Sequence, residues 1–414
     1  MAGDAQGLRI NAGRLLQSLE DMARIGPGVS GGCNRQALTD EDKAGRDQFV
    51  AWARAAGSTV RVDEVGNIFA RRAGLDDGAP PVLAGSHLDT QATGGRYDGV
   101  YGVLSALEAV RVLQDQSITT RRPVEVAVWT NEEGCRFTPA MLGSGVVAGV
   151  HSVQYAYGRT DKDGRRFGDE LERIGYRGAL PAKARPYAAI FEAHIEQGPI
   201  LEAEGVTIGV VTGIQGAYWF DVTLDGQSCH AGPTPMEMRR DPWRAATAII
   251  DGLYALAARH APWGRATIGD VHAFPGARNT VPGRLVVAVD IRHPEPARLE
   301  AMVGELRALV AEHAAMAWRA ADVQQVWHMP ATGFDERLAG LIEGAARSLG
   351  YSHRRMVSGA GHDSLHTAHF APTAMIFVPC AGGLSHNEAE DARPEDLAAG
   401  ANVLLHAMLS AANS

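Results

Sequence analysis

The spacing of hydrophobic positions changes several times along the chain. Apolar residues recur three and four apart in residues 15–22 and again in residues 49–53, which predicts two amphipathic helices. Short apolar runs rich in β-branched residues follow, each bounded by Gly, Pro or charge, as in buried strands. They cover residues 60–65, 81–84, 124–129 and 188–193. Because a helical pattern over residues 99–114 separates two of these runs, the sequence predicts an α/β sheet buried on both faces.

From about residue 211 the pattern becomes that of a separate α+β unit. Polar and apolar positions alternate in WFDVTL, and further strands and helices are predicted before the α/β pattern returns. The strands of this unit cover residues 266–274, 285–292 and 323–327, and its helices cover residues 241–259 and 294–318. The α/β pattern returns with helices over residues 335–349 and 394–409 and a strand over residues 373–378. We therefore expect a catalytic α/β domain with a mixed sheet flanked by helices (residues 1–211 and 329–414), interrupted by an inserted α+β domain (residues 212–328).

The composition of the chain argues against membrane insertion, nucleic-acid binding and a disulfide framework. The chain has 414 residues, of which 45% are hydrophobic and 21% charged, and no run approaches the roughly 18 apolar residues of a membrane span. A net charge of −9 without a Lys/Arg run predicts no nucleic-acid partner. The N-terminal segment has no basic region followed by an apolar core, so we expect a cytoplasmic protein. Four widely spaced cysteines favour buried, reduced thiols over a disulfide framework.

Polar side chains gather where the predicted strands end. The segment GSHLDT directly follows an apolar strand, and α/β proteins form their sites at the carboxyl ends of strands. His87 could bind a metal through one ring nitrogen, while Asp89, two residues further along an extended chain, could accept the other ring N–H. Taken alone, these two residues could equally form a solvated loop end.

Three carboxylates occupy similar positions. Asp98 lies between a glycine-rich loop and a predicted helix, where it would either cap the helix or bridge two cations. Glu132 and Glu133 follow the strand VEVAVWT and precede a glycine. Adjacent glutamates in a loop are usually solvated, but their direct attachment to a buried strand favours a functional role.

Two further histidines complete the candidate metal ligands. His194 follows another apolar strand, and His386 lies in the glycine-rich turn GGLSHNE. Each alone would more often be structural. Together with His87 and the carboxylates they offer nitrogen and oxygen ligands without a thiolate, which suits a pair of Zn²⁺, Mn²⁺, Co²⁺ or Ni²⁺ ions and does not select among them.

The chain resembles a known family in eight stretches between about residues 85 and 390. They are GSHLDT, GGRYDGVYGV, TNEEGCRF, FEAHIEQGPILE, HAGPTPMEMRRD, FPGARNTVPG, SGAGHD and GGLSHNEAE. They are similar to the dinuclear-metal amidohydrolases related to aminoacylases and dipeptidases. HIEQGP and GGLSHNEAE resemble the group of N-carbamoyl-L-amino acid hydrolases and allantoate amidohydrolases rather than the peptidases.

The resemblance implies roles for the candidate ligands. His87, Asp98 and His194 would hold one divalent ion, and Asp98, Glu133 and His386 would hold the other, so that Asp98 bridges the two. Glu132 would be the general base, which takes a proton from water and delivers it to the leaving amine.

Three residues of the predicted inserted domain suit substrate recognition. His230 could donate to a developing oxyanion, Asn279 offers a neutral donor and acceptor, and the fork of Arg292 could grip a substrate carboxylate. Turn residues and a surface ion pair are the alternatives. By the resemblance all three contact the substrate with help from Gln197, and His230 reaches the active site of a neighbouring subunit. The inserted domain would therefore be a lid and a dimer contact, which predicts a homodimer.

Gly361 and His362 are further candidates for the substrate pocket. They lie in the segment GAGHD, where glycine would let the backbone approach a ligand, although the segment could equally be a loop that needs positive φ.

The predicted reaction is metal-dependent hydrolysis of N-carbamoyl-L-amino acids to the L-amino acid, carbon dioxide and ammonia. Allantoate amidohydrolase and N-carbamoyl-β-alanine hydrolase are the alternatives with the same chemistry. A binding protein that kept the fold and lost catalysis is the alternative from another class, and no candidate ligand is missing to favour it.

Overall fold

The computed structural model describes residues 7–316 and 321–414. It divides into two compact units: Met1–Thr212 with Gly333–Ser414, here called the catalytic unit, and Gly213–Thr332, here called the inserted unit. The sequence predicts the corresponding boundaries at 211/212 and 328/329. The predicted fold class, an α/β catalytic part with a mixed sheet and an inserted α+β part, is confirmed.

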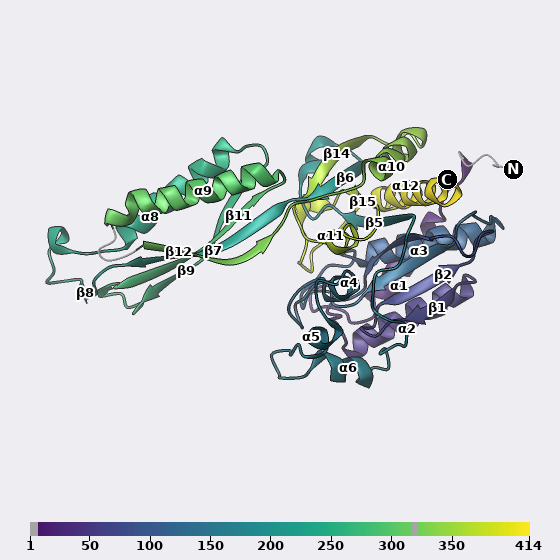
Figure 1. Ribbon diagram of the computed structural model, residues 1–414, viewed down its shortest axis with the longest axis horizontal. Coiled ribbons are helices and arrows are strands. Elements are labelled where there is room, and N and C mark those ends of the chain that lie inside the picture. Colours follow the sequence, from purple (N-terminus) through teal and green to yellow (C-terminus); the bar gives the residue numbers. More distant parts are fainter. Residues whose placement is uncertain (1–6, 317–320) are drawn as a thin grey trace. The chain divides into compact units, whose positions relative to one another are not determined.

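A nine-stranded mixed sheet forms the centre of the catalytic unit (Figure 1). Its strands follow the order β1-β2-β4-β3-β5-β15-β6-β13, and β14 pairs with β6. The neighbours β4, β3, β5 and β15 are parallel, and all their residues are buried, so both faces of the sheet are covered. The bounds are β1 (Thr59–Val62), β2 (Ile68–Arg72), β3 (Val82–His87), β4 (Val124–Trp129), β5 (Ala189–Ile195), β6 (Ile208–Ile214), β13 (Thr332–Gly333), β14 (His353–Ser358) and β15 (Thr373–Val378).

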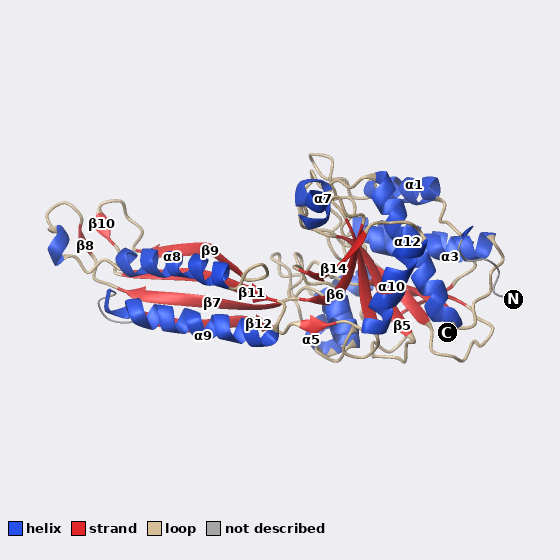
Figure 2. Ribbon diagram, turned by 90° about the horizontal axis from the view of Figure 1, so that it is seen from above, coloured by secondary structure: helices blue, strands red, loops and turns tan. Residues whose placement is uncertain are grey.

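Helices flank this sheet (Figure 2). Helix α3 packs on β3 and β5, and α12 packs on α3 and β15, so these two helices cover the strands that end near one another. Helix α2 begins where the Thr39 hydroxyl accepts the N–H of Asp42. The bounds are α1 (Ala12–Ala23), α2 (Asp40–Ala55), α3 (Val100–Asp115), α4 (Leu142–Val147), α5 (Val153–Tyr157), α6 (Phe167–Arg173), α7 (Ile200–Glu204), α10 (Glu336–Ser348), α11 (Ser364–Thr367) and α12 (Pro394–Asn413).

The inserted unit is a two-layer sandwich of its own. Its antiparallel sheet has the order β12-β7-β11-β9, and α8 and α9 lie along one face (Figures 1 and 2). Burial alternates along β7 and β11, as the sequence predicts for a sheet with one covered face. A short ribbon pairs β8 with β10. The bounds are β7 (Gly216–Asp225), β8 (Cys229–His230), α8 (Trp243–Arg259), β9 (Arg265–Phe274), β10 (Thr280–Val281), β11 (Arg284–His293), α9 (Pro296–His313) and β12 (Ala321–Met329).

Two predicted elements end earlier than expected. The strand predicted over 60–65 stops at Val62, because the Asp63 carboxylate accepts the backbone N–H groups of Val65 and Asn67 and turns the chain into β2. The helix predicted over 294–318 ends at His313 with one 3₁₀ turn after it. Its last two predicted residues, 317–318, lie outside the described residues.

The cysteines are all unpaired, but not all buried. Cys33 and Cys380 are buried as predicted, whereas Cys135 is exposed and Cys229 is half-buried. Within residues 7–316 and 321–414, no helix is long and apolar enough to cross a membrane.

Candidate metal centre

Three parallel strands bring the candidate ligands to one edge of the central sheet. His87 is the last residue of β3, His194 is the sixth residue of β5, and Glu132 and Glu133 follow the end of β4. These strands are neighbours, with β3 between the other two, so their carboxyl ends meet. Asp98 arrives from the loop before α3, whose N-cap residue is Gly99, so the carboxylate of Asp98 is not used as the helix cap.

The side chains form two groups that share one carboxylate. In the first, Asp98 Oδ1 lies 3.1 Å from His194 Nε2 and 3.5 Å from His87 Nε2. In the second, His386 Nε2 lies 3.4 Å from Asp98 Oδ2 and 3.3 Å from Glu133 Oε2. The first group is buried, whereas the side chain of His386 is 52% exposed, so the second group opens to solvent. Each group offers one nitrogen or oxygen atom per residue, at separations that could hold a metal ion.

The orientation of the buried imidazoles fits metal binding. His87 Nδ1 lies 2.8 Å from the carbonyl of Asp89, and His194 Nδ1 lies 3.0 Å from the carbonyl of Ile195. A carbonyl only accepts hydrogen bonds, so both Nδ1 atoms carry the proton and both Nε2 atoms face the carboxylates, with His194 Nε2 also accepting from the backbone N–H of Gly99 at 3.1 Å. Gly99 makes room for this arrangement: its φ is +66°, and a Cβ there would lie 2.3 Å from the ring of His87.

The electrostatics of the first group also fit a cation. Burial alone would raise the pKa of Asp98, but hydrogen bonds and ion pairs with His194 and His87 hold it well below its ordinary value. Burial alone would lower the pKa of His87, but Glu132 and Asp98 raise it well above the ordinary value. These carboxylates therefore favour a positive charge between them, which a divalent ion held by His87, Asp98 and His194 would supply.

Glu132 and Glu133 differ in their partners, although they are adjacent. Glu133 accepts from the backbone N–H of Gln91 at 3.1 Å and from its Nε2 at 2.7 Å, which fixes the carboxylate beside His386. Glu132 is buried, with Oε2 3.5 Å from His87 Nε2, and no described residue donates a hydrogen bond to its carboxylate. Burial raises the pKa of both side chains. Glu132 is thus the carboxylate with accepting capacity left for a ligand.

Asp89 contributes through a different atom from the one predicted. Its backbone carbonyl, not its carboxylate, accepts from His87, because His87 ends β3 and the chain turns back towards the imidazole ring. The Asp89 carboxylate instead accepts from the backbone N–H groups of Glu132 at 3.3 Å and Glu133 at 3.2 Å. Asp89 therefore orients the histidine and holds the glutamate loop.

Several residues around Asp98 are not among the candidates that the sequence predicts. Glu390 accepts from the backbone N–H groups of Tyr97 at 2.9 Å and Asp98 at 3.1 Å, and from the hydroxyl of Ser385 at 3.0 Å. Burial, with Asp98 nearby, raises the pKa of Glu390 to about 7. The sequence feature that could have identified Glu390 is its position at the end of the GGLSHNEAE stretch, four residues after His386.

Gln197 lies inside this cluster. Its Nε2 donates to Asp98 Oδ2 at 2.8 Å and lies 3.0 Å from the hydroxyl of Ser385. Its Oε1 is buried and has no hydrogen-bond partner among the described residues. The residue also has a φ of +56°, a strained conformation that functional sites often contain.

His362 and Gly361 lie beside the two groups that share Asp98, and His362 forms a further buried group of possible ligands with His194 and Glu192. The ring of His362 is buried and meets the ring of His194 edge-on at 4.5 Å, while its Nε2 lies 3.0 Å from the hydroxyl of Ser358. Burial lowers the pKa of His362 well below the ordinary value, so the ring is neutral. Gly361 lies close to the side chain of Met141.

The three candidates in the inserted unit do not form one cluster. The β8–β10 ribbon pairs His230 with Thr280, next to Asn279, and both candidates are exposed. Arg292 lies near the far end of β11, eight residues after its start, which corresponds to about 26 Å of strand. The Arg292 guanidinium forks onto the Asp290 carboxylate, with N–O distances of 2.8–3.1 Å.

Imidazoles and carboxylates lie around one shared aspartate at this edge of the sheet, and Glu132 beside them can still accept a proton. These features define a metal-dependent hydrolase. Comparison with known proteins identifies the family. Residues 83–410 match Peptidase family M20/M25/M40, and this chain belongs to that family, as the sequence resemblance predicted.

The similar proteins extend over nearly the whole chain. An N-carbamoyl-L-amino-acid amidohydrolase of Rhizobium meliloti is 50% identical, and the alignment covers 100% of this chain and 99% of the relative. An allantoate amidohydrolase of Bacillus subtilis is 34% identical, with 93% and 94% covered. The crystal structure of an amidase of the hydantoinase/carbamoylase family from Burkholderia multivorans has a TM-score of 0.95 at 52% identity, with 98% and 99% covered.

Proposed function

We propose that this protein hydrolyses the carbamoyl amide of N-carbamoyl-L-amino acids and releases the L-amino acid, carbon dioxide and ammonia. The observation that carries the proposal is that Asp98 belongs to both groups of candidate ligands while Glu132 stays outside them. The Rhizobium meliloti relative, similar along the entire chain, is named for this reaction.

The proposed cofactor is a pair of divalent ions, Zn²⁺, Mn²⁺, Co²⁺ or Ni²⁺. His87, Asp98 and His194 would hold one ion, and Asp98, Glu133 and His386 would hold the other. When bound, such ions polarise a carbonyl oxygen and bring the pKa of water towards neutrality. Nitrogen and oxygen donors without a thiolate suit all four metals.

Glu132 is the proposed general base and acid. Its carboxylate receives no hydrogen bond from a described residue, so it can take a proton from the attacking water. It then gives this proton to the leaving amine, whose expulsion is slow without it. The other product, carbamate, breaks down to carbon dioxide and ammonia.

Gln197 is the proposed contact for the ureido group. Its Nε2 is held by Asp98, which leaves Oε1 buried and without a hydrogen-bond partner among the described residues. A ureido group carries N–H donors that match such an acceptor. Because an unpaired buried acceptor costs about 1–3 kcal/mol, a substrate that satisfies it gains affinity at this position.

The recognition residues of the inserted unit support a homodimer. His230 and Asn279 lie at one end of β11 and Arg292 near the other, about 26 Å away, far more than the length of a small ureido carboxylate. One inserted unit therefore cannot present all three to one substrate. In the proposed dimer, His230 and Asn279 complete the site of the partner subunit. Arg292 releases the Asp290 carboxylate and binds the substrate carboxylate in its place.

Gly361 and His362 are proposed pocket residues beside His194. Neutral His362 offers a ring nitrogen next to the ligand cluster, and its contact with His194 keeps both rings in place. The proposed location is the cytoplasm, since all four cysteines are unpaired, as suits a reducing compartment.

Allantoate is the second candidate substrate, favoured by the Bacillus subtilis relative. N-carbamoyl-β-alanine is a third with the same chemistry. All three are ureido carboxylates and would use the same metal centre.

Metal replacement with a substrate panel tests the proposal. The protein is stripped with a chelator and reloaded separately with Mn²⁺, Co²⁺, Ni²⁺ or Zn²⁺, and ammonia release is measured for N-carbamoyl-L- and D-amino acids, N-carbamoyl-β-alanine and allantoate. We expect the highest kcat/KM for an N-carbamoyl-L-amino acid and no turnover by the stripped protein. A higher kcat/KM for allantoate would replace the substrate assignment, and full activity after stripping would refute the metal mechanism.

A further inference from the structure

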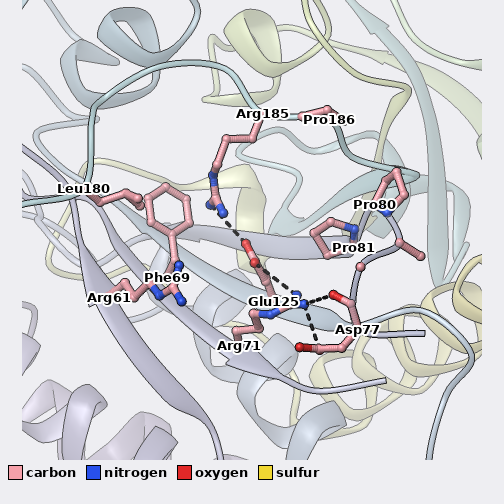
Figure 3. Close-up of a pocket in the computed structure, with 12 residues that line it drawn as sticks. Arg61, Phe69, Arg71, Asp77, Pro80, Pro81, Glu125, Leu180, Arg185 and Pro186 are labelled. Carbon is pink, nitrogen blue, oxygen red and sulfur yellow. Dashed lines mark hydrogen bonds and ion pairs between the residues drawn. The ribbon is translucent and has the colours of Figure 1, made fainter. Parts of the chain in front are cut away.

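A second polar pocket lies in the catalytic unit, away from the metal centre (Figure 3). Its volume is about 350 Å³. Figure 3 shows Glu125 in the middle of the pocket, with Arg185 on one side and Arg71 on the other. Prolines, Leu180 and the ring of Phe69 form the remaining walls.

Strand register explains why these side chains converge. Arg61 of β1 is paired with Phe69 of β2, and Arg71 of β2 is paired with Glu125 of β4. Side chains of directly paired residues point to the same face, and residues two apart in one strand share that face. Arg61, Phe69, Arg71 and Glu125 therefore lie on one face of the sheet. Arg185 reaches the same place from the loop before β5, with its guanidinium 4.7 Å from the centre of the Phe69 ring.

The pocket has one positive charge in excess. Its ionisable lining consists of three arginines and two carboxylates. Arg71 pairs with Asp77 at 2.8 Å, and Arg185 Nη2 pairs with Glu125 at 3.1 Å. The exposed guanidinium of Arg61 has no hydrogen bond or ion pair to any residue in the described ranges 7–316 and 321–414. Arg61 is therefore the charge that the protein itself leaves unbalanced.

Donor atoms are available beside this charge. Arg185 uses Nη2 for both Glu125 and the hydroxyl of Tyr187, and its Nε and Nη1 have no hydrogen-bond partner among the described residues. Stacking against Phe69 and Tyr187 holds its guanidinium plane in position. Arg61 is paired with Phe69 across the strands, Arg185 lies against the Phe69 ring, and both arginines line the pocket.

We propose that this pocket binds a small organic monoanion, whose carboxylate contacts Arg61 and Arg185 and whose apolar group lies against Leu180 and the prolines. A monoanion neutralises the single excess charge, and guanidinium forks match the geometry of a carboxylate. The apolar wall is formed by Ala79, Pro80, Pro81, Leu180 and Pro186.

The pocket is separate from the metal centre. Pro81 precedes β3, whose six residues end at His87, so about 20 Å of extended strand lies between Pro81 and His87. Glu125 likewise lies near the start of β4, whereas Glu132 and Glu133 follow its end. A molecule bound in this pocket therefore does not touch the catalytic carboxylates.

Calorimetric titration of the full chain with benzoate tests the proposal. It is performed on the native protein and repeated in an Arg292→Gln background, which removes the other candidate carboxylate-binding arginine. We expect Arg61→Gln to weaken benzoate binding about tenfold or more, since a hydrogen bond to a charged group is lost, with kcat/KM unchanged in the absence of benzoate. Neutral benzamide should bind at least about tenfold more weakly than benzoate for the same reason.

The matched control is Arg54→Gln, an exposed arginine of α2 that does not line the pocket and should leave benzoate binding unchanged. Arg185 is unsuitable for the test, because its loss would leave the buried Glu125 without its closest cation. Equal benzoate affinity of Arg61→Gln and native protein would overturn the proposal, and so would equal binding of benzoate and benzamide. Binding of inorganic phosphate without binding of benzoate would overturn the organic ligand class.

Discussion

The two units of this chain treat buried charge in opposite ways. The catalytic unit buries most of its candidate metal ligands at the end of its sheet. The inserted unit buries an apolar cluster between its sheet and helices, and among its described residues His293 is the only buried Asp, Glu, His, Lys or Arg. Its recognition candidates, His230 and Arg292, are exposed and half-buried respectively.

The catalytic unit therefore brings its candidate ligands together within one chain, whereas the inserted unit does not bring its recognition candidates together. Unpaired buried charges oppose folding, so the catalytic unit keeps its ligand cluster only because each carboxylate has donors or a cation nearby. The inserted unit folds around an ordinary apolar core, and its recognition candidates lie exposed or half-buried. In the proposed dimer, the catalytic unit would supply the chemistry and the inserted unit would complete the site.

The largest effect is expected from Asp98→Asn. Asp98 belongs to both ligand groups, so its loss should release both ions and abolish turnover, whereas His386→Ala should affect only the second group. Metal analysis of the purified variants, with circular dichroism as the folding control, measures this. Retention of two ions per subunit by a folded Asp98→Asn protein would disprove the bridging role.

The second-largest effect on activity is expected from Glu132→Gln, with the metal content of the protein unchanged. Removal of a general base and acid lowers kcat by roughly 10²–10⁴-fold, and KM should change far less because Glu132 lies outside both ligand groups. Glu41→Gln, an exposed glutamate of α2, is the matched control. Near-normal kcat in a metal-loaded Glu132→Gln protein would remove the assignment.

A mixed-dimer experiment addresses the inserted unit. His230→Ala alone should lower kcat about 10²–10³-fold through loss of a donor to the oxyanion. If the partner supplies His230, mixing the His230→Ala and Glu132→Gln proteins creates hybrids with one intact site. Random exchange should restore about a quarter of the native activity. Mixtures that stay as inactive as their components after verified subunit exchange would show that each subunit uses its own His230.

The smallest effect concerns acid stability. Burial lowers the pKa of His366 to about 4, with His369 and His151 adding to this, whereas an unfolded histidine titrates near 6.5. As the pH falls from 6.5, the unfolded state takes up the proton first, so this histidine should reduce the free energy of unfolding by about 2 kcal/mol at pH 5.

Denaturant unfolding of chelator-treated protein at pH 7 and pH 5 measures this effect. His366→Gln should lose less stability between the two pH values than the native protein does. The exposed His272 of the inserted unit provides the control, since His272→Gln should keep the native pH dependence. An identical pH dependence in all three proteins would contradict the assignment.

Much of the fold follows from local pattern. The apolar strands that became β3, β4, β5 and β15, and the long helices α3, α8, α9 and α12, were all predicted, because each buries a long or continuous apolar surface. Strands β2, β6 and β14 and helices α4–α6 were missed. The helices have seven residues or fewer, and Arg or Gly interrupts the apolar pattern of the strands, so none of these elements has a clear periodicity of its own.

The sequence by itself determined the identity of the candidate ligands, since His87, Glu132, Glu133 and His194 each accompany the end of an apolar strand that can be recognised locally. Only the tertiary structure decided how they meet. Parallel pairing of β4, β3 and β5 brought the strand ends together, and the turn after β3 gave the carbonyl of Asp89, not its carboxylate, to His87. Contacts such as that between Glu390 and the backbone of Asp98 join residues 292 positions apart, which no local pattern encodes.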